Sequence, residues 1–142
     1  MAVAAVAANL SILLEDLQRD EGCSLYPYTD TVGKVTIGFG RNLTDNGISQ
    51  EEANTMLKSD MMNAVDEMRV RFMGMDLSEG VERALLNMAF NMGVPRLKKF
   101  KKMWAALYDG HYATAAEEAL DSRWKDQVGA RAQRVAALIR EG

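Results

Sequence analysis

The stretch RDEGCSLYPYTDTVGKVTIGFGRNLT, residues 19–44, carries the clear strand signals of the chain. Two apolar segments flank a turn at residues 30–33, and their large side chains alternate with a period of two: Tyr26, Tyr28, Val35, Ile37 and Phe39. We therefore predict an antiparallel hairpin, continued by a third strand near residues 42–44. A carboxylate stands at each end of the first strand, Glu21 before it and Asp30 after it.

The residues before this stretch predict a helix with one apolar stripe. Its leucines recur with helical spacing: Leu10, Leu13, Leu14 and Leu17. Asn9 is a suitable N-cap, and Gly22 is expected to end the helix. Glu21 follows Leu17 by four residues and so falls on the same stripe. We expect this placement to bury part of the Glu21 carboxyl group, an environment that favours a protonated acid.

The rest of the chain has helical patterns. Ser49 and Glu52 form a capping box, and apolar residues keep to one face as far as about residue 72. A helix of that length suggests a bridge between two lobes. Four further helices are expected: one that ends at Gly93-Val94-Pro95, and those at residues 96–110, 112–124 and 130–140.

We predict a mostly helical α+β fold for a single domain over residues 1–142. Its parts are a small N-lobe with a hairpin or three-stranded sheet (about residues 15–50), a bridging helix (about 50–72) and a helical C-lobe (about 73–142). The 142 residues suit one domain with a core of its own.

Charge and composition narrow the possible functions. The net charge of −3 argues against a general nucleic-acid binder. The single Cys and the single His exclude an internal disulfide and a Cys/His zinc site, and we expect neither a metal nor a cofactor. The apolar N-terminus has no Lys or Arg before Arg19 and is interrupted by Glu15 and Asp16. It therefore predicts no stable membrane association, with an N-terminal anchor as the alternative.

Glu21 and Asp30 are the candidate reactive pair. They lie nine positions apart, one at a helix end and the other beyond the first strand, so both side chains can reach one cleft. Two carboxyl groups are what cleavage of a glycosidic bond requires: an acid for the leaving oxygen, and a base or anion facing the sugar. On spacing alone, the alternative is two solvated surface groups.

Three segments resemble the phage-type lysozymes. DEG followed by YTDTVGKVTIGFG is similar to that family's signature, in which an Asp follows the Glu by nine residues and a Thr follows the Asp by six. Glu21, Asp30 and Thr36 keep both spacings. SRWKDQVGARAQRV (residues 122–135) and AFNMG (residues 89–93) are similar to two further family segments.

The resemblance implies a lysozyme-like fold and hydrolysis of the β-1,4 bond between N-acetylmuramic acid and N-acetylglucosamine in peptidoglycan. It makes Glu21 the general acid, Asp30 a base or an electrostatic partner, and Thr36 the residue that positions water. By the same resemblance Arg131 pairs with Glu21. Gly38 and Phe39 line the cleft floor, and Asn91 supports substrate binding.

The sequence departs from the family pattern at two features. Arg41 stands where the family often has His, so we expect an ion pair whose cation is always charged. The protein is also acidic, so it binds an anionic wall weakly or through a local patch. Residues 96–102 form a basic cluster. Of its two interpretations, a wall-facing surface and the solvated side of a helix, we favour the second.

Two other activities stay open at this stage: a lytic transglycosylase, which needs one acid and no attacking water, and a peptidoglycan-binding relative without activity. The presence of both Asp30 and Thr36 favours the hydrolase. We expect a monomer with peptidoglycan as its partner. It would wait in the host cytoplasm until a holin-type protein opens the membrane, with virion association as the alternative.

Overall fold

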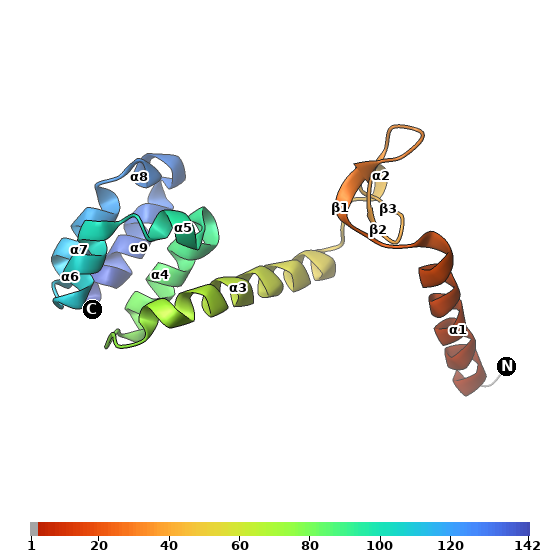
Figure 1. Ribbon diagram of the computed structural model, residues 1–142, viewed down its shortest axis with the longest axis horizontal. Helices are drawn as coiled ribbons and strands as arrows, with labels where there is room; N and C mark the ends of the chain where they lie inside the picture. The colour runs from red at the N-terminus through yellow and green to blue at the C-terminus, as the bar shows by residue number, and fades with distance from the viewer. Residues whose placement is uncertain (1–2) are drawn as a thin grey trace. The chain divides into compact units, whose positions relative to one another are not determined.

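The structure is a computed structural model that describes residues 3–142 and divides into two compact units. Unit 1 comprises residues up to Ala53, and unit 2 comprises Asn54–Gly142. The strands are β1 (Ser24–Thr29), β2 (Val35–Gly38) and β3 (Arg41–Asn42) (Figure 1). The helices are α1 (Val3–Glu21), α2 (Leu43–Asn46), α3 (Gln50–Phe72), α4 (Glu79–Met92), α5 (Val94–Leu97), α6 (Lys101–Tyr108), α7 (Tyr112–Leu120), α8 (Arg123–Val128) and α9 (Ala130–Glu141). The predicted α+β, mostly helical class is confirmed.

Helix α1 begins earlier than the sequence analysis predicted. Its first residue in the described part of the chain is Val3, so Asn9 lies inside the helix and does not cap it. The Ala-rich run before Asn9 explains the extension, because Ala has the highest helix propensity. The helix ends at Glu21 as predicted, and Gly22 follows with φ +67°, a conformation that glycine adopts at little cost.

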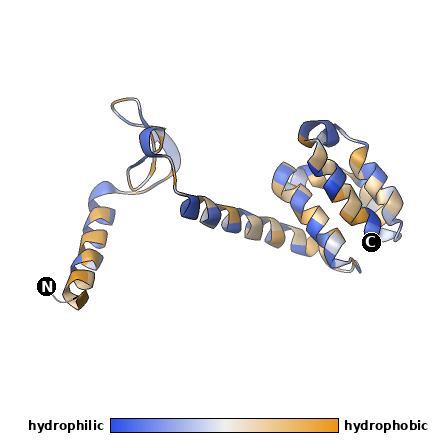
Figure 2. Ribbon diagram, turned by 180° about the vertical axis from the view of Figure 1, so that it is seen from behind, coloured by the Kyte–Doolittle hydropathy of each residue, from blue (hydrophilic) through white to orange (hydrophobic). Residues whose placement is uncertain are grey.

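The expected burial of Glu21 is wrong. Glu21 is exposed, and α1 has no buried residue. Its leucine stripe is exposed because no other element of unit 1 packs on it. Figure 2 shows this hydrophobic stripe along α1.

The hairpin forms with the predicted turn. Strands β1 and β2 pair antiparallel, with Tyr28 opposite Thr36, and the N–H of Gly33 donates to the carbonyl of Asp30 (3.1 Å) to close the turn. The predicted third strand is shifted. Strand β3 ends at Asn42, whose side chain accepts a hydrogen bond from the N–H of Asp45 and so caps the short helix α2. This cap diverts residues 43–44 into a helix instead of a strand.

The start of α3 is fixed by the predicted capping box and by an ion pair. Glu52 accepts from the N–H of Ser49 (2.8 Å), and the Ser49 hydroxyl accepts from the N–H of Glu52 (3.1 Å). The Arg41 guanidinium donates one hydrogen bond to each carboxylate oxygen of Glu52, at 2.7 and 2.9 Å. This confirms the predicted ion pair with a permanently charged cation. The Arg41 hydrogen bonds, together with the Ser49 N–H, lower the pKa of Glu52 to about 2.

Unit 2 contains the hydrophobic core. Every buried hydrophobic residue of the described chain lies between Ala64 and Ile139. Helix α9 packs on α4 and α7, and α6 packs on α7. The largest fully buried side chain is Trp124, whose exposed fraction is 1%. None of the described helices is both long enough and apolar enough to cross a membrane.

Two predicted helices of unit 2 are each divided in the structure. The segment 96–110 splits into α5 and α6, because Phe100 leaves helical geometry at ψ 58°. The segment 112–124 splits into α7 and α8 at Asp121, whose ψ is 61°. The predicted helix end at Gly93-Val94-Pro95 is confirmed, because α4 ends at Met92 with Gly93 as its C-cap. Pro95 lies in the first turn of the next helix, α5, a position that its fixed φ suits. The last helix, α9, forms as predicted.

Candidate active site

Glu21 stands where α1 ends, and its carboxyl group lies against Gly40. A Cβ added at Gly40 would come 3.4 Å from the Oε2 atom of Glu21. The absence of a side chain at Gly40 therefore lets the carboxyl group approach the backbone between β2 and β3. A cavity of about 420 Å³, lined by Phe39, Gly40 and Arg41 among others, adjoins the same backbone.

Asp30 follows β1 and is held by the turn that it begins. Its Oδ1 atom accepts hydrogen bonds from the N–H of Val32 (2.9 Å) and of Lys34 (2.8 Å). This arrangement, in which an Asp side chain bonds the backbone two residues on, is an Asx turn. One carboxylate oxygen is thereby fixed, and Oδ2 is available to water or to a ligand.

Thr36 is anchored to the same residue as Asp30. Its hydroxyl donates to the Lys34 carbonyl at 3.3 Å, and the Asp30 N–H donates to that carbonyl at 2.8 Å. The backbone of Lys34 therefore links the two side chains across the turn. Thr36 is also the buried polar residue of the described chain, with an exposed fraction of 5%. A hydroxyl that donates to the backbone keeps its lone pairs for accepting a hydrogen bond from water.

Gly38 and Phe39 continue the chain from Thr36 toward Gly40. Gly38 has φ +68° and Gly40 has φ +86°, so the two glycines make a bend that residues with a side chain rarely adopt. Phe39 lies between them and is half exposed. Unit 1 thus contains two separate arrangements, Glu21 beside Gly40 and the pair of Asp30 and Thr36 on Lys34.

Arg131, the predicted partner of Glu21, lies in unit 2 at the start of α9. Its Nε donates to the side-chain oxygen of Asn87 (2.7 Å) and its terminal nitrogen donates to the Asn87 carbonyl (3.3 Å). Asn87 on α4 therefore orients the guanidinium group. Arg131 and Asn87 also line a cavity of about 500 Å³ within unit 2. The pairing of Arg131 with Glu21 stays a prediction.

The side chain of Asn91 forms a hydrogen bond with the buried Trp124. Its side-chain oxygen accepts from the indole N–H of Trp124 at 2.8 Å. The buried ring of Trp124 thereby satisfies its one polar group, and α4 is linked to α8. The predicted role of Asn91 toward substrate stays a prediction, and the structure adds this second role.

Asn87 and the contact of Gly40 with Glu21 were not predicted from the sequence, although the GFG stretch that contains Gly40 was expected at the cleft floor. Gly40 carried a signal, since it is the second glycine of GFG, but its contact with Glu21 depends on how α1 meets the sheet. Asn87 precedes Asn91 by four residues and so shares a face of α4 with it. Within residues 3–142, no group of three Cys, His, Asp or Glu side chains is placed to hold a metal ion.

Comparison with known proteins identifies related chains. The family model described as phage lysozyme matches residues 18–141, which confirms the resemblance predicted from the DEG and TIGFG motifs. The chain is 32% identical to the pre-baseplate central spike protein Gp5 of Enterobacteria phage T4. That alignment covers 94% of this chain and 28% of the spike protein, so the chain spans under a third of that relative.

Two relatives match over nearly their whole length. Probable T4-type lysozyme 2 of Dictyostelium discoideum is 28% identical, and the alignment covers 94% of this chain and 96% of that protein. Probable T4-type lysozyme 1 of the same organism is 25% identical with the same coverage.

Proposed function

The chain belongs to the phage lysozyme family, and on that premise we propose that it is a muramidase. It hydrolyses the β-1,4 bond between N-acetylmuramic acid and N-acetylglucosamine in peptidoglycan. The observation that carries this proposal is the anchoring of Asp30 and Thr36 on one residue, Lys34, in the same unit as Glu21.

Glu21 is the general acid in this proposal. Its proton passes to the glycosidic oxygen as the bond to the muramic acid C1 breaks. Enzymes of this type place the acid beside the scissile bond. The exposed position of the Glu21 carboxyl group, beside a residue without a side chain, is compatible with this role.

Asp30 and Thr36 act on the second reactant, the attacking water molecule. The water oxygen bonds to C1 and its proton passes to Asp30; in the alternative, Asp30 stabilises the positive charge that develops on the ring and the proton passes to bulk water. The free Oδ2 atom of Asp30 and the free lone pairs of the Thr36 hydroxyl support this assignment. Both side chains are held in place by the Lys34 backbone before any substrate arrives.

Arg131 is proposed as a positioning residue for Glu21. A guanidinium beside a carboxyl group holds its orientation and stabilises it after the proton has left. Asn87, which holds Arg131, belongs to the same group of residues.

Delivery to the wall is proposed to follow one of two routes. In the first, the protein reaches the wall once a holin-type protein opens the cytoplasmic membrane, and cell lysis follows. The spike protein named among the relatives suggests the second route, in which a lysozyme domain is carried by the virion.

The test is digestion of purified peptidoglycan by wild type and by Glu21→Gln, with mass analysis of the fragments. Glu15→Gln is the matched control, because it makes the same change on the same exposed helix. Wild type and the control should release fragments with new reducing ends. Glu21→Gln should be at least about 100-fold slower, the usual contribution of a general acid.

Three results would overturn the proposal. Anhydro ends on the fragments would make the protein a transglycosylase. An unchanged rate for Glu21→Gln would remove Glu21 as the acid, while inactivity of wild type itself would favour a binding role.

A further inference from the structure

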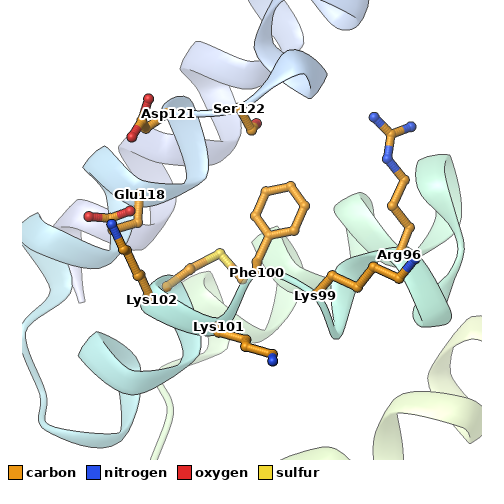
Figure 3. Close-up of a pocket in the computed structure, with 9 residues that line it drawn as sticks. Arg96, Lys99, Phe100, Lys101, Lys102, Glu118, Asp121 and Ser122 are labelled. Atoms are coloured by element: carbon orange, nitrogen blue, oxygen red, sulfur yellow. The ribbon is translucent and has the colours of Figure 1, made fainter.

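Four cations border one groove of unit 2. Arg96, Lys99, Lys101 and Lys102 line a cavity of about 540 Å³, which we name the basic groove. Phe100 lies in its middle, with Arg96 and Lys99 on one side of the ring and with Glu118, Asp121 and Lys102 on the other (Figure 3). Residues 96–102 hold five of the 17 Lys and Arg residues of a protein whose net charge is −3. The positive charge is therefore concentrated at one place on an acidic molecule.

The two carboxylates that line the groove, Glu118 and Asp121, offset part of this charge but form no ion pair with any of the four cations. The ion pairs of residues 3–142 include none of them, and Arg96 donates to a neutral partner, the side-chain oxygen of Gln127 (2.9 Å). The N-cap of α6, Phe100, has no side-chain hydrogen bond to the helix, and the first turn carries Lys101 and Lys102 but no acid. Cations at the positive end of a helix dipole are unfavourable. The four cations are exposed, as the solvated-helix interpretation predicts, but four cations against two carboxylates leave the groove with an excess of positive charge that an anion would offset.

The backbone beneath the cations is fixed. Leu97 and Trp104 are buried, and the indole N–H of Trp104 donates to the Leu97 carbonyl at 3.0 Å. This bond spans the turn between α5 and α6 and ties it to the core of unit 2. The bases of the cationic side chains are therefore held in place before a ligand binds, which lowers the entropic cost of binding.

We propose that the basic groove binds a chain of phosphodiester-linked polyols, the anionic type of polymer found on bacterial cell surfaces. Four cations on consecutive turns match a ligand with several phosphates better than one ion. The carboxylates of Glu118 and Asp121, which line the same cavity, would repel a flat anionic bilayer, whereas a thin chain can follow Arg96, Lys99 and Lys101 past them. Nucleic acid fits less well, because single strands are bound by successive aromatic rings and Phe100 is the one ring of this groove.

Such binding would hold an acidic protein on an anionic surface. A net negative charge slows approach to a polyanion, and a local positive patch reverses that effect at short range. The inference thereby extends the proposed muramidase activity by naming a surface that retains the enzyme near its substrate. The binding itself does not depend on hydrolysis.

The test measures binding of the full-length chain to synthetic poly(glycerol phosphate) by calorimetry over a series of salt concentrations. The variant is Lys99→Glu/Lys102→Glu. The control is Lys58→Glu/Lys125→Glu, which changes the net charge equally at two exposed lysines of unit 2 outside the groove. Wild type and control should show a slope of log K against log salt of about −3, from four contacts at about −0.7 each. The groove variant should bind at least about tenfold more weakly, with a slope reduced by about 1.4.

Three competing probes decide between ligands. Inorganic phosphate, vesicles containing phosphatidylglycerol and a thymidine oligonucleotide are each titrated under the same conditions. Stronger binding of any of these than of the polyol phosphate would overturn the proposal, as would an equal loss of affinity in variant and control. Circular dichroism of the groove variant checks that α6 still forms. If that variant is unfolded, Lys101→Gln, which removes an unfavourable charge from the helix start, replaces it.

The experiments distinguish a failure of the groove proposal from a failure of the muramidase proposal. The polymer contains no peptidoglycan, so a binding isotherm is obtained whether or not the protein is a muramidase. Hydrolysis of peptidoglycan freed of phosphate polymers should be the same for wild type and for the groove variant. A loss of that hydrolysis in the groove variant alone would show that the groove serves the sugar or peptide substrate and not the polymer.

Discussion

Gly40 is the residue whose lack of a side chain matters most for Glu21. Its φ of +86° disfavours any other residue, and a Cβ there would lie 3.4 Å from the Glu21 Oε2 atom. Gly40→Ala should therefore lower stability by about 1–2 kcal/mol through backbone strain and also lower the rate of hydrolysis, because the added methyl group would touch the carboxyl group and restrict its movement. Chemical denaturation and initial rates measure the two effects.

Gly74→Ala provides the control for that experiment. Gly74 has a similar φ of +79°, and a Cβ added there meets nothing within 4 Å. It should lose similar stability and keep the activity of wild type. Equal losses of activity in both variants would mean that Gly40 acts through stability alone.

Two substitutions of Asp30 distinguish the structural role of its carboxylate from its chemical role. In Asp30→Asn the side-chain oxygen can still accept from Val32 and Lys34, so the turn should survive. The thermal midpoint should stay close to that of wild type, while hydrolysis falls at least about 100-fold, as expected when a general base or charge is lost. Asp30→Ala removes both bonds and should also cost about 1–3 kcal/mol of stability. Full activity in Asp30→Asn would contradict a role for its charge.

The residues of the candidate site differ in how far the sequence could predict them. Glu21, Asp30 and Thr36 are close in the chain, and their spacing carries the family signature. The contacts of Arg131 with Asn87 and of Trp124 with Asn91 join residues 44 and 33 positions apart. Such pairs depend on helix packing, which a local spacing rule does not describe.

At the scale of elements, the ion pair of Arg41 and Glu52 joins β3 to α3. It makes the folding stability of unit 1 depend on pH. The folded pKa of Glu52, about 2, lies below its ordinary value of 4.5. The pair therefore contributes its full stability above about pH 4.5 and loses it as the pH falls toward 2. Glu52→Gln should be less stable than wild type at pH 7 and equally stable near pH 2.

Denaturation of both proteins at a series of pH values measures this difference. Glu67→Gln on the exposed side of the same helix is the control and should show no such pH dependence. A difference between Glu52→Gln and wild type that persists at pH 2 would contradict the ion-pair explanation.

The hydrogen bond between Asn91 and Trp124 links α4 to α8. Asn91→Ala leaves the indole N–H of a buried ring without its acceptor, which should cost about 1–3 kcal/mol. In a Trp124→Phe background the same substitution should cost much less, because the donor is already gone. A double-mutant cycle on unfolding free energies measures this coupling. If Asn91→Ala instead leaves stability unchanged and raises KM, the substrate role is the correct one.

Element boundaries were predicted where a local signal marks them. The capping box of Ser49 and Glu52 and the glycine after Glu21 each satisfy backbone groups within a few residues, so the start of α3 and the end of α1 were correct. The break between α5 and α6 was not predicted. Leu97, Phe100 and Trp104 keep helical spacing across it, so the apolar pattern does not reveal the change of backbone direction at Phe100.

At the scale of the whole molecule, the hydrophobic core and the three proposed catalytic residues lie in different units. All buried hydrophobic residues of the described chain belong to unit 2, whereas Glu21, Asp30 and Thr36 belong to unit 1. A fragment from Ser49 to Gly142 should therefore fold with a cooperative thermal transition, since it keeps the cap of α3 and the entire core. It should have no hydrolase activity. A fragment without cooperative unfolding would mean that unit 2 depends on unit 1 for its stability.

The central claim, that water cleaves the glycosidic bond with Glu21 as acid, is tested most directly in water enriched in ¹⁸O. Peptidoglycan is digested by wild type and the new ends are examined by mass spectrometry, with Glu21→Gln in parallel. The account predicts one heavy oxygen at each new reducing end from wild type and no new ends from Glu21→Gln. New ends without the heavy oxygen, or labelled ends from Glu21→Gln at the wild-type rate, would contradict it.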